Sequence, residues 1–199
     1  IYFNKNLQKY SVTYTFGKNR NKQQYFIGSQ ENNIKLHQAN FAHKFASFWL
    51  FELMGKTSEN ILETENFNNR NYTIRANEIQ PKISFLYNKN NRFTAFYHFK
   101  DKENQLPSFE QLNQQKFGFE YFYISSKKNQ ISTNINVFLN DFNGDTNTPI
   151  AYQMLEGLQS GQNYTWSILF NQKLNPFLNL NLNYLGRKSE NAKSIHTGS

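Results

Sequence analysis

Apolar and polar residues alternate along most of this chain, in segments of roughly ten residues. The clearest example lies between residues 178 and 183, where three leucines alternate with three asparagines. Successive side chains of a β-strand point to opposite faces, so this period of two predicts strands with one apolar and one polar face. The pattern predicts about ten strands. They begin near Tyr10, Ile34, Ser47, Ile79, Phe93, Phe117, Ile131, Tyr164, Leu178 and Ser194.

The connections between these segments alternate in length. Short turns are expected near residues 44–46, 89–91, 126–129 and 174–176, and long polar loops at about 17–33, 56–77, 101–114 and 142–162 and from residue 186 onward. Short turns at one end and long loops at the other are typical of an antiparallel barrel with a periplasmic rim and an external rim. We therefore predict an all-β fold, an antiparallel up-and-down transmembrane β-barrel that forms one domain over residues 1–199 and belongs to a larger barrel.

The two faces of the predicted strands have separate roles in such a barrel. Apolar faces would contact lipid, and asparagine faces would line a wet lumen in which amides bond one another and trapped water, while tyrosine and tryptophan would lie at the membrane interfaces. The residues expected to face lipid are Ile131, Ile135, Val137, Ile168, Phe170, Leu178, Leu180 and Leu182. Those expected to face the lumen are Asn134, Asn136, Asn179, Asn181 and Asn183. Those expected at the interfaces are Trp49, Tyr97, Tyr164, Trp166 and Tyr184. In the alternative, a soluble β-sandwich, a second sheet would bury the apolar faces.

The composition agrees with an apolar wall around a wet interior. Aromatic residues make up 17% of the chain, yet the mean hydropathy is -0.77. The formal net charge is +8, but the basic residues are scattered, with Lys18, Arg20 and Lys22 expected in one loop. This distribution favours outer-membrane lipid and lipopolysaccharide as partners over nucleic acid. The chain has no cysteine, so it holds no disulfide and no thiolate metal site.

One loop segment carries oxygen ligands at alternate positions. Asp141, Asn143, Asp145 and Asn147 form a D-x-N-x-D-x-N pattern, the spacing with which calcium-binding loops wrap the ion. The glycine at the sixth position and the glutamate at the twelfth that complete such a loop are absent. A calcium site at these four residues is one hypothesis, and a polar loop rich in turn-forming residues is the alternative that the incomplete pattern favours.

No constellation of residues predicts catalysis. His37 and His43 share a face of a strand but lie too far apart along it to chelate one metal. Ser84 and His98 lie on strands that are expected to pair, but no G-x-S-x-G elbow accompanies them. We therefore expect no enzyme activity and, calcium aside, no cofactor.

The segment Ala151–Ser160 is the one stretch with helical character inside a long loop. Its apolar residues are Tyr152, Met154, Leu155 and Leu158. They would fold inward as a partial plug, dock a partner, or pack among themselves in an external loop. The sequence leaves these alternatives open.

Three stretches resemble a known group of membrane proteins. Residues 149–166 read PIAYQMLEGLQSGQNYTW, residues 178–199 read LNLNLNYLGRKSENAKSIHTGS, and residues 69–104 read NRNYTIRANEIQPKISFLYNKNNRFTAFYHFKDKEN. They resemble the C-terminal end of large outer-membrane proteins of the Bacteroidota, particularly the flavobacteria. The resemblance implies a bacterial outer-membrane location and a longer, signal-bearing precursor. It also implies that HTGS precedes the aromatic end of a final strand, which we expect to be incomplete here. It implies no established activity.

The function expected from these observations is non-enzymatic. The leading expectation is a partner-binding component of a cell-envelope assembly, export or surface machine, with lipoproteins or other envelope proteins as partners. The alternative is an outer-membrane channel or TonB-dependent-type transporter for a solute. A soluble β-sandwich binding module is the third.

Overall fold

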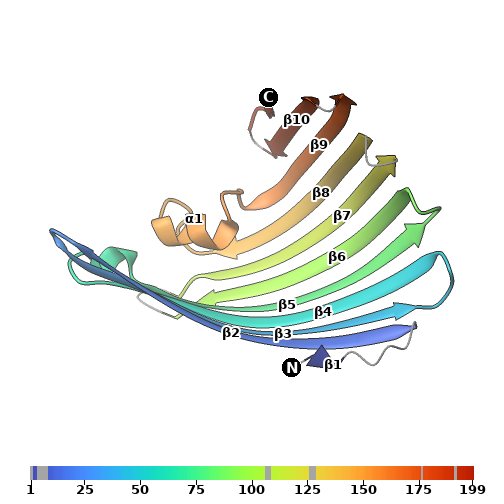
Figure 1. Ribbon diagram of the computed structural model, residues 1–199. Coiled ribbons are helices and arrows are strands. Elements are labelled where there is room, and N and C mark those ends of the chain that lie inside the picture. Colours follow the sequence, from blue (N-terminus) through green and yellow to red (C-terminus); the bar gives the residue numbers. More distant parts are fainter. Residues whose placement is uncertain (1, 4–8, 106–108, 126–128, 176, 191) are drawn as a thin grey trace.

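One antiparallel sheet contains every strand in the part of the chain that the structure describes. The computed structural model describes residues 2–3, 9–105, 109–125, 129–175, 177–190 and 192–199. The sheet has 11 strands, and each strand pairs with its neighbours in the sequence (Figure 1). The strands are β1 (Tyr2–Phe3), β2 (Tyr10–Tyr25), β3 (Gly28–Lys44), β4 (Trp49–Thr64), β5 (Tyr72–Leu86), β6 (Asn91–Asn104), β7 (Gln111–Ser125), β8 (Asn129–Asn143), β9 (Gly161–Asn175), β10 (Leu178–Ser189) and β11 (Ile195–Gly198). This arrangement confirms the predicted all-β, antiparallel up-and-down fold.

The sheet is strongly curved and therefore has a concave and a convex face (Figure 1). Among the described residues, β1 and β11 form the two edges of the sheet and do not pair with each other. These strands thus form a curved wall rather than a closed ring. No helix in the described ranges is long and apolar enough to cross a membrane.

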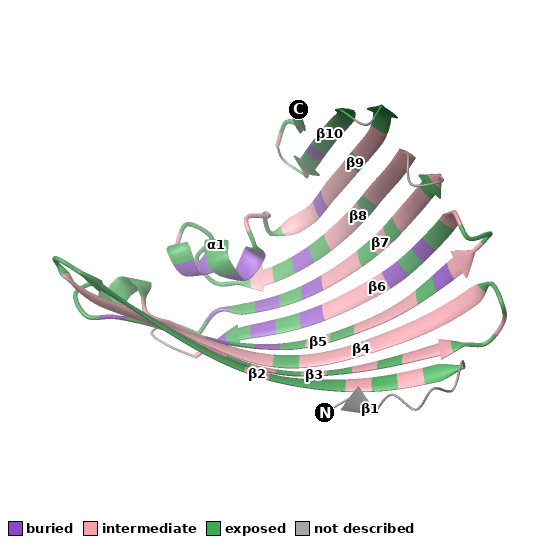
Figure 2. Cartoon of the chain, in the orientation of Figure 1, coloured by how far each residue is buried: buried purple, intermediate pink, exposed green. Residues whose placement is uncertain are grey.

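The register assigns each side chain to a face, because directly paired residues on neighbouring strands lie on the same face. Leu112 of β7 packs against helix α1 (Pro149–Leu155), which lies over the concave face (Figure 1). Leu112 pairs with Lys102 of β6 and Phe142 of β8, so these residues are concave as well. Followed across the sheet, the register places the apolar sets of the sequence alternation on the convex face. Figure 2 shows that buried positions gather beneath α1 on β6, β7 and β8, whereas β2 and β10 are mostly exposed.

The prediction of a first long loop is wrong. Residues 17–33 were expected to be a long connection, but β2 and β3 pair continuously from Gly17 and Leu36 to Tyr25 and Gly28. The turn of this hairpin needs only residues 26–27, and Gly28 has a φ of 124°, which favours glycine. Polar side chains occupy both faces of this extension, so it has strand geometry without the alternation that reveals a strand. Its basic residues Lys18, Arg20 and Lys22 therefore lie on a strand and not in a loop.

The other connections follow the predicted alternation, but the loops are shorter than expected because the strands continue beyond their apolar stretches. The same end of the sheet as the 26–27 turn carries residues 65–71, with a short 3-10 helix η1 (Asn68–Arg70), residues 105 and 109–110, and residues 144–160. The opposite end carries the turns at 45–48 and 87–90. The predicted turn at 126–129 falls largely on residues 126–128, and the one at 174–176 includes residue 176; these residues lie outside the described ranges.

The helix in the long loop begins earlier than the sequence indicated. Its N-cap is Thr148, whose hydroxyl accepts a hydrogen bond from the backbone N–H of Ala151 at 3.0 Å. Pro149 follows at the first helical position, where a missing N–H costs nothing. The helix ends at Leu155, because the next residue, Glu156, has a left-handed backbone with φ 56° and ψ 36°. The predicted segment Ala151–Ser160 therefore misses the first two residues of the helix, Pro149 and Ile150, and extends past its end.

Candidate functional site

Helix α1 packs onto the concave face through apolar side chains. Its residues Ile150, Met154 and Leu155 are buried against Ile74 of β5 and Leu112 of β7. The structure shows this segment folded against the concave face with Tyr152 left exposed, and its role as a partial plug stays a prediction. The loop that follows is tied to the same face by amides.

Two asparagines make those ties. The Nδ2 of Asn140 on β8 donates to the carbonyl of Gln159 at 2.9 Å, and the Nδ2 of Asn163 on β9 donates to the same carbonyl at 2.8 Å. The side-chain oxygen of Asn163 accepts from the backbone N–H of Gln159 at 3.2 Å. Both asparagines are buried, so each amide replaces contacts with water that burial removes.

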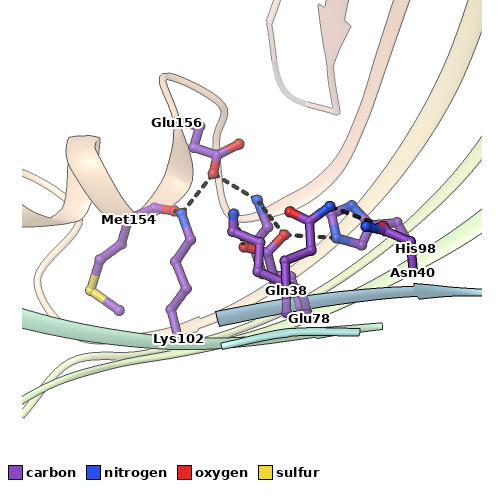
Figure 3. Close-up of polar contacts among 9 residues, drawn as sticks. Gln38, Asn40, Glu78, His98, Lys102, Met154 and Glu156 are labelled. Atoms are coloured by element: carbon purple, nitrogen blue, oxygen red, sulfur yellow. Dashed lines mark hydrogen bonds and ion pairs between the residues drawn. The ribbon is translucent and has the colours of Figure 1, made fainter. Parts of the chain in front are cut away.

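A network of ion pairs joins α1 to the sheet (Figure 3). The Oε1 of Glu156, directly after the helix, lies 2.8 Å from the Nζ of Lys100 and 2.8 Å from the Nζ of Lys102. The Nζ of Lys102 also donates to the carbonyl of Met154 at 2.7 Å. A lysine ammonium at the last turn of a helix satisfies a free carbonyl and faces the negative end of the helix dipole.

A second carboxylate on the sheet extends this network. Glu78 of β5 lies with its Oε1 2.8 Å from the Nζ of Lys56 and its Oε2 3.0 Å from the Nε2 of His98. The same Oε2 is 3.8 Å from the Nζ of Lys100. Lys56, Glu78, His98 and Lys100 come from three neighbouring strands and meet because the register pairs Glu78 with Lys56 on one side and with Lys100 on the other.

Positive charge exceeds negative charge around α1. Lys116 of β7 pairs with His98, and its ammonium lies 5.0 Å from the ring centroid of Phe96 and 5.2 Å from that of Phe138. These rings stabilise the ammonium by cation–π attraction. Among the described residues, Lys116 has no carboxylate at ion-pairing distance.

Electrostatics hold the carboxyl of Glu156 in its charged form. Burial against the sheet would raise the pKa of this carboxyl, but the ammonium groups of Lys102 and Lys100 outweigh burial and lower the pKa to about 2. The Glu156 side chain is still 49% exposed, so water screens part of this attraction.

The same sign of charge prevails over the whole concave face. Lysine and arginine outnumber glutamate there, whereas the charges on the convex face balance. The register places these basic residues on the concave face: Lys56, Lys82, Arg92, Lys100, Lys102, Lys116 and Arg187. The acidic residues beside them are Glu52, Glu78, Glu110, Glu120 and Glu156. A groove of about 320 Å³ on this face, over β2 to β5, is lined by side chains that include Thr13, Asn40, Glu52, Gln80 and Lys82.

The convex face carries the residues that were predicted to face lipid. Ile131, Ile135 and Val137 of β8 lie opposite Phe170, Trp166 and Tyr164 of β9, and Leu182 lies opposite Phe170. These side chains are only partly covered by their neighbours: Ile135 is 50% exposed and Leu182 is 51% exposed. No second sheet of the described residues covers them, as a β-sandwich would require. Their contact with lipid stays a prediction.

The asparagines predicted to face a lumen lie on the concave face. The Nδ2 of Asn134 donates to the hydroxyl of Ser167 at 3.4 Å, and that of Asn136 donates to the hydroxyl of Thr165 at 3.2 Å. The partners are therefore hydroxyls of the neighbouring strand rather than the other amides that the sequence suggested. Asn179, Asn181 and Asn183 share this face through the pairing of Asn181 with Asn171.

The predicted interfacial aromatics are all on the convex face. Trp49 lies against Phe85 with ring centroids 4.8 Å apart, at the end of the sheet that carries the short turns. The hydroxyl of Tyr97 donates to the Oε1 of Gln115 at 3.2 Å, and that of Tyr184 lies 2.7 Å from the Nδ1 of His196. Trp166 covers Gly186 so closely that a Cβ on this glycine would lie 2.2 Å from the indole. Tyr164 pairs with Val137.

The proposed calcium ligands do not share one local structure. Asp141 and Asn143 lie on the extended end of β8, while Asp145 and Asn147 lie in the loop before α1. The Oδ1 of Asp145 accepts from the backbone N–H of Asn147 at 2.9 Å, as in an ordinary turn. In the described ranges no cluster of three or more His, Cys, Asp or Glu residues is arranged to hold a metal. Calcium binding at these residues stays a prediction.

The remaining chemical candidates have ordinary partners. The hydroxyl of Ser84 lies 2.9 Å from that of Thr94 and not beside His98, whose partner is Glu78. On the convex face, His37 lies 2.7 Å from the hydroxyl of Tyr14, and His43 lies 3.0 Å from the carbonyl of Lys9.

Comparisons with known proteins give only distant likenesses. No protein-family model matches the chain, and no curated protein sequence matches it. Among solved structures, the NanC porin is similar with a TM-score of 0.46 and 11% identity, over 89% of this chain and 86% of the porin chain. The translocator domain of autotransporter NalP from Neisseria meningitidis is similar with a TM-score of 0.42 and 7% identity, over 96% of this chain and 72% of that chain.

Proposed function

We propose that this chain forms part of the wall of a bacterial outer-membrane β-barrel that conducts solutes, with α1 folded into the lumen as a constriction. The observation that carries the proposal is the contrast between the two faces of one curved sheet. The convex face is apolar and partly exposed, and the concave face is polar and charged. This is the arrangement of a barrel that meets lipid outside and water inside.

The height of the apolar band fits a membrane. On β8 the convex positions from Ile131 to Leu139 are apolar or threonine, and the next convex residue is Asp141. Nine residues of strand span about 26 Å, or about 20 Å along the membrane normal at a tilt of about 40°. An outer-membrane barrel carries an apolar band about 25 Å tall. The strands continue past the band as polar extensions, which would stand in the external leaflet and beyond.

The position of α1 supports its proposed role as a constriction. In a barrel, a loop that folds inward narrows the lumen, and here α1 covers the concave ends of β5 to β8. The charges beside it would act on any solute that passes, because their ion pairs lie on the concave surface itself.

A second candidate is the partner-binding envelope component expected from the sequence. The edge formed by β2 favours it: β1 pairs only with Val12 and Thr13, and the described residues provide no other strand on that side of β2. An open edge of this length is a template for another strand, either from the same barrel or from a partner. The resemblance to Bacteroidota proteins does not separate the two candidates.

Reconstitution of the full-length protein tests the proposal. The protein would be inserted into planar lipid bilayers and its conductance recorded. Discrete conductance steps that scale with protein concentration are expected. Insertion without conductance, together with co-purification of fixed companions in mild detergent, would favour the partner-binding candidate instead.

A further inference from the structure

Two lysines on the concave face share a carboxylate that a separate part of the chain brings to them. Glu156 lies outside the sheet, directly after α1, and its Oε1 is 2.8 Å from both the Nζ of Lys100 and the Nζ of Lys102 (Figure 3). The carboxylate reaches these lysines only while α1 lies against the sheet. The lysines stay on the concave face whether α1 is there or not.

Removal of this carboxylate would leave the lysines short of negative charge. Glu78 is the other carboxylate of the network, and its oxygens already contact Lys56 and His98 at 2.8 and 3.0 Å. It lies 3.8 Å from Lys100. The ammonium of Lys102 would lose both its carboxylate and the carbonyl of α1. A cation pair without its counter-charge in a partly enclosed site attracts an external anion.

The backbone of Glu156 is held in a conformation that a glutamate rarely adopts. Its φ is 56°, and among the described non-glycine residues it is the one with a positive φ. Side chains with a Cβ disfavour this region, so the surrounding contacts must maintain it. In the described part of the chain, the Glu156 side chain makes two ion pairs, and its backbone N–H donates to the carbonyl of Tyr152.

We propose that Lys100 and Lys102 form a binding site for the carboxylate of an anionic solute, and that Glu156 occupies this site as an internal competitor. A solute carboxylate takes the place of Glu156 between the two ammonium groups and releases the C-terminal end of α1 from the concave face. Neutral solutes have no carboxylate to bind the two ammonium groups and therefore do not displace Glu156. The role of the site in solute passage rests on the proposed channel function.

Hydrogen exchange of residues 149–158 tests the displacement directly, in the full-length protein in detergent. The probe is sodium gluconate, with sorbitol as the uncharged analogue and sodium chloride as the control for ionic strength. Gluconate is expected to speed exchange in this segment, and the two controls are not. In Glu156→Gln, gluconate binding measured by calorimetry should tighten about tenfold, since the competitor is gone.

Two further variants separate the site from general electrostatics. Glu52→Gln is the matched control: it removes a concave carboxylate from its ion pair with Lys82, at 3.1 Å, and so changes the net charge of the face equally. It should leave gluconate binding unchanged. The double variant Lys100→Gln and Lys102→Gln should abolish the response to gluconate.

The outcomes distinguish this proposal from the channel itself. Unchanged exchange with gluconate, or equal tightening in Glu156→Gln and Glu52→Gln, would overturn the carboxylate site even if the protein conducts ions. A response at residues 149–158 that depends on Lys100 and Lys102 would establish the site even if bilayers show no conductance, and the channel proposal alone would then fail.

Discussion

The docking of α1 depends on one side chain that can be removed cleanly. Met154 is 0% exposed and lies between α1 and the sheet, against Ile74 and Leu112. Replacement of a buried methionine by alanine costs about 2 to 5 kcal/mol. The lower part of this range, about 2 to 3 kcal/mol, applies here because α1 has only seven residues and lies in a loop, so it can move toward the sheet and close part of the cavity. At 1.4 kcal/mol per factor of ten, Met154→Ala should shift the docking equilibrium about 30-fold to 150-fold toward the released helix.

Hydrogen exchange with peptide resolution measures this shift. Exchange of residues 149–158 should accelerate by about that factor in Met154→Ala, while the amides of β8 and β9 stay protected. Tyr152→Ala is the matched control, because Tyr152 lies on the same helix and is 71% exposed. Equal acceleration in both variants, or a loss of protection throughout the sheet in Met154→Ala, would refute the view that α1 is a separate element docked by its apolar side.

Three other perturbations test separate parts of the structure. Ile135→Arg should destabilise the folded barrel in lipid by about 2 to 4 kcal/mol, as measured by urea unfolding in vesicles. Asn136→Arg, one residue further along and on the other face, should cost much less, and equal costs would contradict the assignment of faces. Gly186→Ala should cost about 1 to 3 kcal/mol in the same assay because its Cβ would lie 2.2 Å from an indole, whereas Gly55→Ala, with nothing within 4 Å, should be neutral or stabilising. The pKa of Glu156 is lowered from 4.5 to about 2, so its contribution to docking is complete above about pH 4.5 and disappears as the pH falls toward 2. Hydrogen exchange of α1 should therefore accelerate over this pH range, and exchange that stays constant would contradict the ion pairs.

The faces of the strands could be predicted from the sequence because a strand has an exact period of two. Because Leu180 and Leu182 alternate with Asn181 along one strand, the two leucines must lie on one face and the asparagine on the other. The register pairs Ile135 directly with Trp166, so these two residues share a face. The membrane depths expected for them stay predictions.

The lengths of the strands could not be predicted in the same way. Beyond the apolar band, both faces carry polar residues, so the alternation that identifies a strand vanishes although the backbone pairing continues. The hairpin that turns at residues 26–27 was therefore taken for a loop. The start of α1 was a different error, since Thr148 followed by Pro149 is a recognisable helix start in the sequence.

The charged site lay beyond sequence reasoning because register, rather than spacing, brings it together. Lys56, Glu78 and Lys100 meet on three adjacent strands, and a shift of pairing by one residue would place them on different faces. Glu156 joins them from a loop that lies 56 residues after Lys100 in the chain. The one available signal was the alternation of His98, Lys100 and Lys102, which placed three basic side chains on a single face.

The central claim is that one face of this sheet meets lipid and the other meets water, and spin labelling tests it most directly. The chain has no cysteine, so single cysteines can be introduced and labelled at Ile135 and Leu180 on the convex face and at Asn136 and Asn181 on the concave face. In lipid vesicles, the first pair should collide with dissolved oxygen and the second pair with a water-soluble nickel complex. Four labels that are equally accessible to the nickel complex would contradict a membrane-spanning wall.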